Sequence, residues 1–418
     1  MPETIVIVGA GHAGGELATS LRQNGFDGRI VMVGDEPYLP YQRPPLSKGF
    51  LAGEMNEGSL ATRPQATYEK ANVELVLGTR VTRIDRGGKS IDLADGSTLH
   101  YDGLALATGS APRRLVLPGA DLDSLSNVHY LRALDDVAPI RAHLEPGRRL
   151  VVIGGGYIGL EVASVAIKRG LHVTVIEIAP RVMSRVTSPE ISTFFEGVHR
   201  EAGVDLRLGA HATRFEIDTE KNAVNAVVCR DASGESVLPA DVVLVSIGVL
   251  PSTALAEAAG LEVDNGIVVD ELTRTSDPSI VAAGDCTNHP NDFYGRRVRL
   301  ESVPNAMEQA RAAAATLAGK PKPYASVPWF WSDQYGLKLQ TVGLSDGYER
   351  VVMRGSPAAR AFSAFYMKGE HILAIDIVAR PKELVVSKRL VAERVVVDPA
   401  RLADESVPLQ SLLPPAGA

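Results

Sequence analysis

Two short segments carry residues that could hold dinucleotides. The first is Gly9-Ala10-Gly11-His12-Ala13-Gly14, and the second is Gly154-Gly155-Gly156-Tyr157-Ile158-Gly159. In such a loop the first glycine permits a tight turn, the second lets the backbone approach a pyrophosphate, and the third lets helix and strand pack closely. The N–H groups at the start of the following helix then favour the anion. Two such loops predict two bound dinucleotides.

An internal repeat places each loop between a strand and a helix. Residues 5–8 and 30–33 predict strands on either side of a helix that ends near Asn24. Residues 150–153 and 173–176 predict the same around a helix that ends near Arg169. A constant offset of 145 residues relates Gly9 to Gly154 and Glu16 to Glu161. Strands that alternate with helices predict parallel α/β units.

Acidic residues follow the second strand of each unit. Glu177 closes this strand in the second unit, where a carboxylate can accept from the adenosine ribose hydroxyls and repel a 2′-phosphate, so NADH is favoured over NADPH. The alternative is a solvated strand end, and nearby Arg181 leaves some NADPH use open. In the first unit Gly34 takes this position, so we favour Asp35 as the ribose ligand, with Glu36 second.

Three further segments could contact a planar cofactor. Residues 104–110 predict a strand that ends in the small-residue turn Thr108-Gly109, although this can also be a plain strand exit. Residues 279–286 predict a strand that runs into Gly284-Asp285, where the carboxylate could accept from a ribityl hydroxyl or cap a helix. In residues 41–48 two prolines fix the backbone before Lys48, which could equally be a surface lysine at a helix start.

Composition excludes several classes of protein. The 418 residues suggest two to four domains, and a net charge of −7 without a long basic run argues against nucleic-acid or anionic-membrane binding. The two cysteines, Cys229 and Cys286, form no CxxC pair, which excludes dithiol oxidoreductases and cysteine-rich metal proteins. The histidines show no metal-binding spacing, so we expect no metal. No apolar run is long enough for a targeting or membrane segment, so we expect a cytoplasmic protein.

Five features stand out together: the paired glycine loops, Ala107-Thr108-Gly109, Gly284-Asp285-Cys286, Arg43-Pro44-Pro45-Leu46-Ser47-Lys48 and Pro328-Trp329-Phe330-Trp331-Ser332-Asp333-Gln334. On these motifs the chain resembles the FAD-dependent, NADH-linked ferredoxin reductases of bacterial oxygenase systems, and the resemblance covers nearly the whole chain. It implies a glutathione-reductase-like α/β fold, with two Rossmann-type dinucleotide-binding domains and a C-terminal α+β domain. The implied FAD-binding domain is discontinuous, over residues 1–111 and 247–324. The implied NAD-binding domain spans 112–246 and the C-terminal domain 325–418.

The same resemblance implies roles for individual residues. Lys48 and Glu161 are implied as a catalytic pair near flavin N5 and the nicotinamide, in which Lys48 stabilises the reduced flavin and Glu161 holds Lys48. Trp331 and Pro45 are implied to lie near the isoalloxazine ring. The predicted FAD-binding residues are Gly9, Gly11, Ala13, Gly14, Asp35, Glu36, Pro45, Lys48, Val81, Thr108, Gly109, Arg132, Asp285, Val303 and Trp331, and the predicted NAD-binding residues are Gly154, Gly156, Tyr157, Ile158, Gly159, Glu161, Glu177 and Gly248.

The missing cysteines set the predicted direction of electron flow. Disulfide-reducing relatives carry a CxxxxC pair where this chain has Pro44, Pro45 and Lys48. We therefore expect hydride transfer from NADH to non-covalently bound FAD, followed by single-electron transfers to an external carrier. The expected partner is a [2Fe–2S] ferredoxin, bound transiently, that serves a cytochrome P450 or related oxygenase.

Partner recognition leaves less trace in the sequence. Such ferredoxins are acidic, so we expect a basic patch, for which Arg311, Lys338, Lys388 and Arg389 are candidates. Two alternative functions remain open: a rubredoxin or monodehydroascorbate-type reductase, and an NADH-sensing flavoprotein of the apoptosis-inducing-factor group. Trp329 and Trp331 alternate along a predicted strand and so face one side, although this spacing also fits simple packing.

Overall fold

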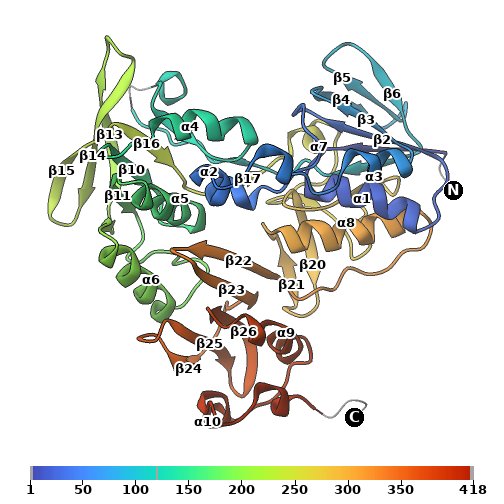
Figure 1. Ribbon diagram of the computed structural model, residues 1–418. Helices are drawn as coiled ribbons and strands as arrows, with labels where there is room; N and C mark the ends of the chain where they lie inside the picture. The colour runs from blue at the N-terminus through green and yellow to red at the C-terminus, as the bar shows by residue number, and fades with distance from the viewer. Residues whose placement is uncertain (1–2, 119–120, 415–418) are drawn as a thin grey trace. The chain divides into compact units, whose positions relative to one another are not determined.

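The structure is a computed structural model that describes residues 3–118 and 121–414 (Figure 1). The chain forms two compact units and passes between them repeatedly. Unit 1 comprises Met1–Gln42, Glu57–Ala111 and Leu250–Trp329, and unit 2 comprises Arg43–Asn56, Pro112–Val249 and Phe330–Ala418. Each unit is therefore assembled from segments that are far apart in the sequence.

A five-stranded parallel sheet in the order β19-β7-β1-β2-β3 forms the centre of unit 1. Ile5 and Ile7 pack with α1 and α8, which lie side by side in Figure 1, whereas Val6 and Val8 enter the core on the other face. A sheet covered on both faces reads as a continuous apolar run, which explains residues 5–8. The elements of this layer are β1 (Thr4–Val8), α1 (His12–Gln23), β2 (Arg29–Gly34), α3 (Gln65–Lys70), β3 (Val73–Leu77), β7 (Gly103–Leu106), β19 (Ile280–Ala282) and α8 (Val303–Leu317).

Two smaller sheets complete unit 1. An antiparallel sheet, β4-β5-β6, packs its apolar side chains, among them Val81 and Ile84, into the same core as Val6 and Val8. The second small sheet has the order β18-β20-β21. The remaining elements of unit 1 are η2 (Glu57–Ser59), β4 (Val81–Asp85), β5 (Ser90–Leu93), β6 (Thr98–His100), α7 (Ala254–Ala258), β18 (Ile267–Val268), β20 (Thr287–Asn291) and β21 (Arg296–Val298).

Unit 2 contains a second parallel sheet, in the order β12-β11-β10-β16-β9. Val151 and Ile153 of β10 pack against Phe215 and Val227 of an antiparallel sheet, β13-β14-β15. The elements are η3 (Leu122–Ser124), β9 (Val128–Tyr130), η4 (Leu134–Asp136), α4 (Val137–His143), β10 (Arg149–Ile153), α5 (Tyr157–Lys168), β11 (His172–Glu177), α6 (Pro189–Glu201), β12 (Asp205–Leu208), β13 (His211–Asp218), β14 (Ala223–Asp231), β15 (Gly234–Pro239) and β16 (Val242–Val245).

The C-terminal part of unit 2 is an antiparallel sheet in the order β22-β23-β26-β25-β24. Phe362, Phe365 and Ile375 of the paired strands β25 and β26 are fully buried. Short helices pack against the sheet, α9 against β23 and β26, and α10 against β24. Its elements are β22 (Trp329–Gln334), β23 (Leu337–Gly343), β24 (Arg350–Ser356), β25 (Ala361–Lys368), β26 (His371–Val378), η5 (Pro381–Glu383), α9 (Leu384–Ala392), α10 (Pro399–Ala403) and η6 (Leu409–Leu412).

One short segment from the N-terminal part of the sequence also belongs to unit 2. It contains η1 (Pro44–Ser47) and α2 (Gly49–Ala52). Two short strands, β8 (Ser110–Pro112) and β17 (Val249–Pro251), lie where the chain passes from one unit to the other. Across the described ranges, no helix has the length and apolar character needed to cross a membrane.

Candidate active site

The loop between β1 and α1 is shaped by its three glycines. Gly9 has a φ of +112°, and a Cβ there would lie 2.2 Å from the carbonyl oxygen of Ala107. A Cβ at Gly14 would lie 1.9 Å from the Gly9 carbonyl oxygen, so the helix can approach the strand only with glycine at this position. A Cβ at Gly11 would meet no described protein atom within 4 Å. The first and third glycines are thus needed for packing, and the second faces the side where a pyrophosphate can approach.

The loop between β10 and α5 repeats this geometry. Gly154 has a φ of +111°, with the Ser246 carbonyl oxygen 2.2 Å from its Cβ position, and a Cβ at Gly159 would lie 2.3 Å from the Gly154 carbonyl oxygen. The Cβ position of Gly156 again has no described atom within 4 Å. Gly156, like Gly11, is the N-cap of its helix and offers no side chain to the first helical N–H groups. Both helix starts can therefore donate to an anion.

Glu177, at the end of β11, lies against the second glycine loop. Its carboxylate accepts from the backbone N–H of Gly155 at 2.6 Å and of Ala179 at 2.8 Å. Arg181 is engaged elsewhere, because its guanidinium donates to the carbonyl oxygens of Ser184 and Thr187. The carboxylate is therefore positioned beside the loop, while the nearby cation is tied to the backbone.

The acids after β2 in unit 1 have different partners. Asp35 forms an ion pair with Arg80 at 3.2 Å, and both side chains are more than half exposed. Glu36 accepts from the Tyr41 hydroxyl at 2.6 Å. These contacts do not decide between Asp35 and Glu36 as the ribose ligand, and the preference for Asp35 stays a prediction.

Several other residues predicted to contact FAD meet around the start of α1. A Cβ at Gly284 would lie 3.3 Å from the Cβ of Ala13, which brings the Gly284-Asp285 turn to the first turn of this helix. Asp285 accepts from the Ser110 hydroxyl at 2.8 Å. Thr108 donates to the Ser252 carbonyl oxygen at 2.7 Å. Elsewhere in unit 1, Gly109 has a φ of +68°, Val303 is the first residue of α8, and Val81 is the first residue of β4.

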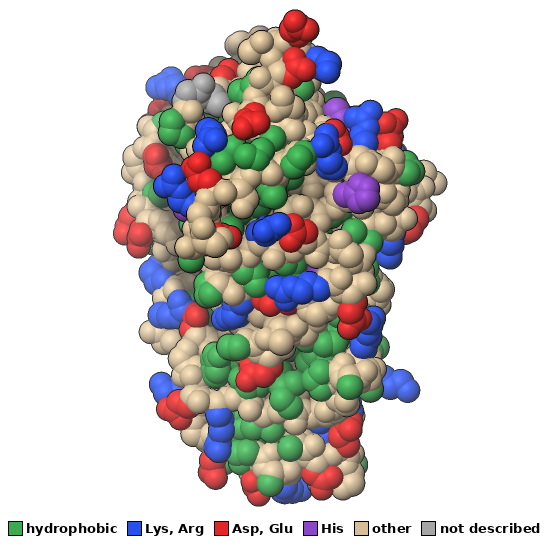
Figure 2. All heavy atoms as spheres, turned by 90° about the vertical axis from the view of Figure 1, so that its left-hand side faces the viewer, with side chains coloured by type: hydrophobic (Ala, Val, Ile, Leu, Met, Phe, Trp, Pro, Cys, Tyr) green, Lys and Arg blue, Asp and Glu red, His purple; other side chains and the backbone are tan. Residues whose placement is uncertain are grey.

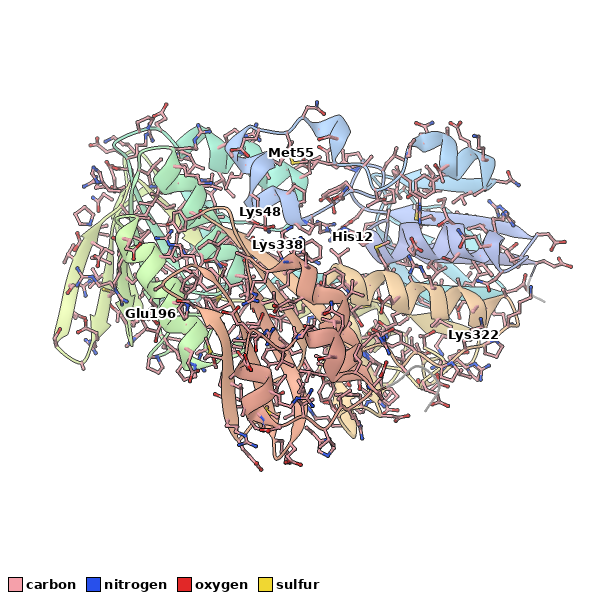
Figure 3. The ribbon with its side chains drawn as sticks, turned by 60° about the horizontal axis from the view of Figure 1, so that its bottom comes forward. His12, Lys48, Met55, Glu196, Lys322 and Lys338 are labelled. Carbon is pink, nitrogen blue, oxygen red and sulfur yellow. The ribbon has the colours of Figure 1, made fainter. Side chains whose placement is uncertain are left out.

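A buried carboxylate in unit 2, that of Glu161, is surrounded by hydrogen-bond donors. Glu161, on α5, is 3% exposed, and its Oε2 lies 2.7 Å from Nζ of Lys48, which is 18% exposed (Lys48 is labelled in Figure 3). The hydroxyl of Ser47 donates to the same Oε2 at 2.5 Å, and the hydroxyl of Ser332 donates to Oε1 at 2.6 Å. Three donors from two separate parts of the chain, the neighbours Ser47 and Lys48 and the distant Ser332, thus compensate the buried charge.

The local sequence explains how Lys48 reaches this carboxylate. Pro44 and Pro45 open the short helix η1, where a missing N–H costs nothing. The helix ends at Ser47, so Ser47 and Lys48 follow each other into the site, and Lys48 Nζ also donates to the Pro44 carbonyl oxygen at 3.1 Å. Sequence reasoning missed Ser47 and Ser332 as contributors. Both lie in motifs that carried the resemblance, Ser47 before Lys48 and Ser332 after Trp331, but no local signal marks either hydroxyl as a donor to Glu161.

The remaining residues predicted for the cofactors occupy varied positions in unit 2. The Tyr157 ring packs against the Phe330 ring at 5.4 Å between centroids, and burial raises the pKa of Tyr157 well above its ordinary value. Ile158 is exposed, Gly248 has a φ of +96°, and Trp331 lies in β22. Pro45 accepts at its carbonyl oxygen from the Lys48 N–H, and Arg132 accepts at its own carbonyl oxygen from the Arg43 guanidinium at 2.8 Å.

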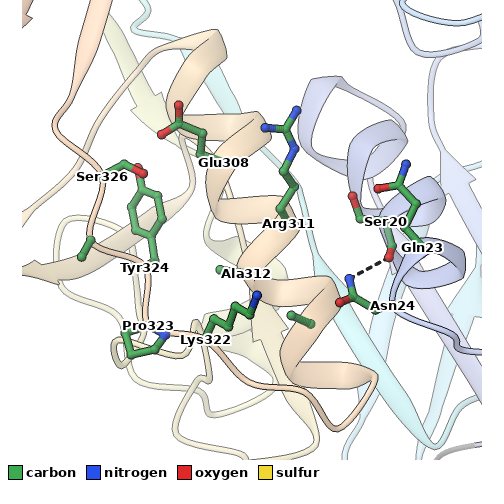
Figure 4. A pocket seen from close by; sticks show the side chains of 12 residues that line it. Ser20, Gln23, Asn24, Glu308, Arg311, Ala312, Lys322, Pro323, Tyr324 and Ser326 are labelled. Carbon is green, nitrogen blue, oxygen red and sulfur yellow. Dashed lines mark hydrogen bonds between the residues drawn. The ribbon is translucent and has the colours of Figure 1, made fainter. Parts of the chain in front are cut away.

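The residue equivalent to Glu161 in the first repeat has a different role. Glu16, on α1, is 5% exposed and accepts from Arg63 at 2.5 Å and from Arg311 at 2.6 Å. Arg311 also borders a pocket of about 340 Å³ between α1 and α8, together with Asn24 and Lys322 (Figure 4). Arg311, a predicted partner contact, is therefore held by a buried carboxylate while its side chain remains 55% exposed.

The other basic residues predicted for partner binding have acidic neighbours. Lys338 lies 3.8 Å from Asp333, and Arg389 lies 2.8 Å from Glu393. On the face drawn in Figure 2, Lys and Arg side chains are interspersed with Asp and Glu side chains. Lys388 lies beside Arg389 on α9. The basic patch stays a prediction.

Comparisons with known proteins define the class of this chain. Residues 3–310 match the pyridine nucleotide-disulphide oxidoreductase family, and residues 329–413 match the reductase C-terminal family. The chain belongs to the pyridine nucleotide-disulphide oxidoreductase family. The predicted glutathione-reductase-like fold class is thereby confirmed.

Individual relatives are more specific. The chain is 49% identical over 416 residues to putidaredoxin reductase from Pseudomonas putida, covering 100% of this chain and 98% of the relative. It is 44% identical to rhodocoxin reductase from Rhodococcus erythropolis, and the match covers 97% of this chain and 93% of that relative. The solved covalent putidaredoxin reductase–putidaredoxin complex matches with a TM-score of 0.94 at 49% identity, covering 98% of each chain. The resemblance to ferredoxin reductases stated from the motifs is confirmed.

Proposed function

We propose that the protein is an FAD-dependent NADH:ferredoxin oxidoreductase that serves a cytochrome P450 or related oxygenase. The observation that carries this proposal is the pair of glycine loops with the same geometry, one in each unit, on a chain whose relatives are named as ferredoxin reductases. One loop is available for FAD and the other for NADH. FAD, when bound, would supply the redox chemistry, because a flavin can accept two electrons together and release them one at a time.

The FAD-binding residues are proposed to lie mainly in unit 1. Gly9, Gly11 and Gly14 would receive the pyrophosphate at the start of α1, and Asp35 or Glu36 would bind the ribose. The Gly284-Asp285 turn beside Ala13 supports the assignment of Asp285 to the ribityl chain. We propose the FAD-binding domain as residues 1–111 and 247–324. Val81, Thr108, Gly109, Arg132, Val303, Pro45 and Trp331 remain proposed contacts.

NADH is proposed to bind the second loop. Gly154, Gly156 and Gly159 would receive its pyrophosphate, and Glu177 would accept from the ribose hydroxyls. The Glu177 carboxylate is already held beside Gly155 by a 2.6 Å hydrogen bond, which supports this role. Tyr157, Ile158 and Gly248 remain proposed contacts. We propose residues 112–246 as the NAD-binding domain and 325–418 as the C-terminal domain.

Lys48 and Glu161 are proposed to act as one unit in hydride transfer. Lys48 would place a positive charge near the flavin, on which negative charge would develop when it receives hydride from the nicotinamide. Glu161 would fix the direction of Lys48, because their ion pair is mostly buried and the carboxylate is further held by Ser47 and Ser332. The described geometry supports a preorganised charge at this position.

Electrons are proposed to leave without a protein disulfide. Cys229 and Cys286 are both buried and free, and burial raises the pKa of both thiols, which disfavours the reactive thiolate. Because no reactive thiol is available to receive them, the two electrons from one NADH would leave from the flavin. They would reduce two molecules of a [2Fe–2S] ferredoxin by one electron each. We propose a cytoplasmic location as well, since the two cysteines form no disulfide.

Stopped-flow absorbance of the purified flavoprotein tests this proposal. We expect rapid bleaching of the flavin by NADH, then reoxidation by a [2Fe–2S] ferredoxin much faster than by oxygen, rubredoxin or small quinones. Rubredoxin is the critical comparison, because a rubredoxin-NAD(+) reductase from Pseudomonas putida is 41% identical to this chain. Faster reoxidation by rubredoxin would favour that alternative. Bleaching that persists with every carrier would favour the sensor class.

A further inference from the structure

A line of hydrogen bonds continues from Glu161 away from Lys48. Ser332, which donates to Glu161, lies 3.2 Å from the amide nitrogen of Gln334, two residues along β22. The amide oxygen of Gln334 lies 2.9 Å from Nε2 of His199 on α6. The other imidazole nitrogen, Nδ1, lies 3.1 Å from the hydroxyl of Tyr335.

The chemistry of each group gives this line one direction. A carboxylate only accepts, so the Ser332 hydroxyl donates to Glu161 and is left to accept from the Gln334 N–H. The Gln334 oxygen then accepts from His199, which places the imidazole proton on Nε2. Burial lowers the pKa of His199 to about 4, so the ring is neutral and its Nδ1 accepts from Tyr335. Every donor therefore points toward the Glu161 carboxylate.

The residues of this line are held rigidly by their surroundings. Ser332, Gln334 and His199 are each no more than 1% exposed. The Tyr335 ring packs on the His199 ring at 4.9 Å between centroids. The Tyr335 backbone N–H donates to the hydroxyl of Ser164 at 2.9 Å, which ties the end of β22 to α5, three residues beyond Glu161. A buried chain of this kind leaves each member few alternative partners.

We propose that Tyr335, His199, Gln334 and Ser332 form a directed hydrogen-bond relay that positions Glu161, and through it Lys48, for hydride transfer from NADH. The proposal rests on the proposed function for the step that it serves. Gln334 and His199 are positioning residues here, because they act on the site through Ser332. The relay gives the C-terminal β22 and the helix α6 a part in the chemistry of a lysine from the N-terminal part of the sequence.

The first test is structural and needs no turnover. In the ¹⁵N-histidine-labelled holoprotein, NMR should show His199 neutral at pH 7 with the proton on Nε2. The Gln334→Met variant keeps side-chain length but removes the amide oxygen that accepts from His199 and the amide N–H that donates to Ser332, so the His199 Nε2–H signal should shift. A charged ring, a proton on Nδ1, or an unchanged signal in Gln334→Met would overturn the relay.

The second test separates positioning from binding. We expect Gln334→Met to lower the limiting rate of NADH-driven flavin reduction about tenfold, since the buried hydrogen bond that orients the Ser332 hydroxyl toward Glu161 is lost. The Kd for NADH should change less than about twofold. Tyr335→Phe keeps the ring on His199 and should lower the rate by about two- to threefold. Tyr366→Phe is the matched control: it removes a buried hydroxyl that donates to Asp376, also in unit 2, and should leave the rate unchanged.

The outcomes are distinguishable. Wild-type rates in both relay variants, or a rate loss matched by the loss of NADH affinity, would overturn the proposal. If Gln334→Met fails to fold, Tyr335→Phe and the histidine NMR still decide it. A wild-type protein that NADH does not reduce would refute the proposed function, whereas the NMR result would still stand for or against the relay.

Discussion

Replacing Glu177 with alanine is expected to reduce the preference for NADH over NADPH by roughly two orders of magnitude. A hydrogen bond from a ribose hydroxyl to a carboxylate contributes about 1.5–3 kcal/mol, which corresponds to about a 10- to 150-fold loss of kcat/KM for NADH. The same change removes a negative charge that opposes the 2′-phosphate of NADPH. We expect a smaller gain on that side, about tenfold or less, because the charge is partly exposed and screened.

The structure limits how far the preference can reverse. Arg181 is the nearest predicted cation in sequence, but its guanidinium donates to Ser184, Thr187 and Ser192 and is not free to take a phosphate. Arg181→Met is therefore the control: it should lower thermal stability and leave the coenzyme ratio unchanged.

The assay is steady-state reduction of a saturating electron acceptor with NADH or NADPH varied. Glu177→Gln should fall between wild type and Glu177→Ala, because one amide oxygen can still accept from Gly155 or Ala179. A ratio of kcat/KM values that changes less than about threefold in Glu177→Ala would refute the ribose assignment. A ratio that changes in Arg181→Met would show that this guanidinium reaches the coenzyme after all.

Three further predictions follow from the buried groups and the glycine loops. Lys48→Met leaves the Glu161 carboxylate, which is 3% exposed, with only hydroxyl donors. We therefore expect flavin reduction to slow about tenfold or more and the free energy of unfolding to fall by about 2–4 kcal/mol. A reduction rate within about twofold of wild type would refute the electrostatic role of Lys48. Gly159→Ala should unfold unit 2, because the new Cβ would lie 2.3 Å from the Gly154 carbonyl oxygen, and circular dichroism can show this loss of structure. Gly156→Ala should fold normally but bind NADH more weakly, which a binding titration can show. Burial raises the pKa of Asp376 to about 6, so the folded state favours its protonated form. The free energy of unfolding should therefore fall by about 3 kcal/mol as pH rises from about 4 to 6. Asp376→Asn should remove this decline from thermal unfolding curves, and a pH slope identical to that of wild type would contradict the assignment.

Local sequence patterns were sufficient for the two nucleotide-binding units. The predicted strands at residues 5–8 and 150–153 correspond to Thr4–Val8 and Arg149–Ile153, and the predicted helix ends near Asn24 and Arg169 lie one residue beyond the observed ends. These elements were predictable because apolar runs, glycine turns and helix ends are all encoded within about 30 residues.

The surroundings of Glu161 could not be read in the same way. Ser47 lies 114 residues before it and Ser332 lies 171 residues after it. Nothing in the local pattern of either serine distinguishes it from a surface hydroxyl. Glu16 makes the same point, because it occupies the equivalent helix position but is held by Arg63 and Arg311 instead. Repeat symmetry predicted the position of each glutamate, and long-range topology decided its partners.

The partners of Glu161 also have a consequence for biosynthesis and truncation. During translation, Ser47 and Lys48 emerge first and Glu161 follows, but Ser332 is added only after the whole second glycine-loop region has been made. A nascent chain, or a fragment cut before β22, would therefore carry both nucleotide loops and still lack one donor to its buried carboxylate. Removing the C-terminal sheet should consequently impair the handling of NADH itself, and not merely the docking of an electron acceptor.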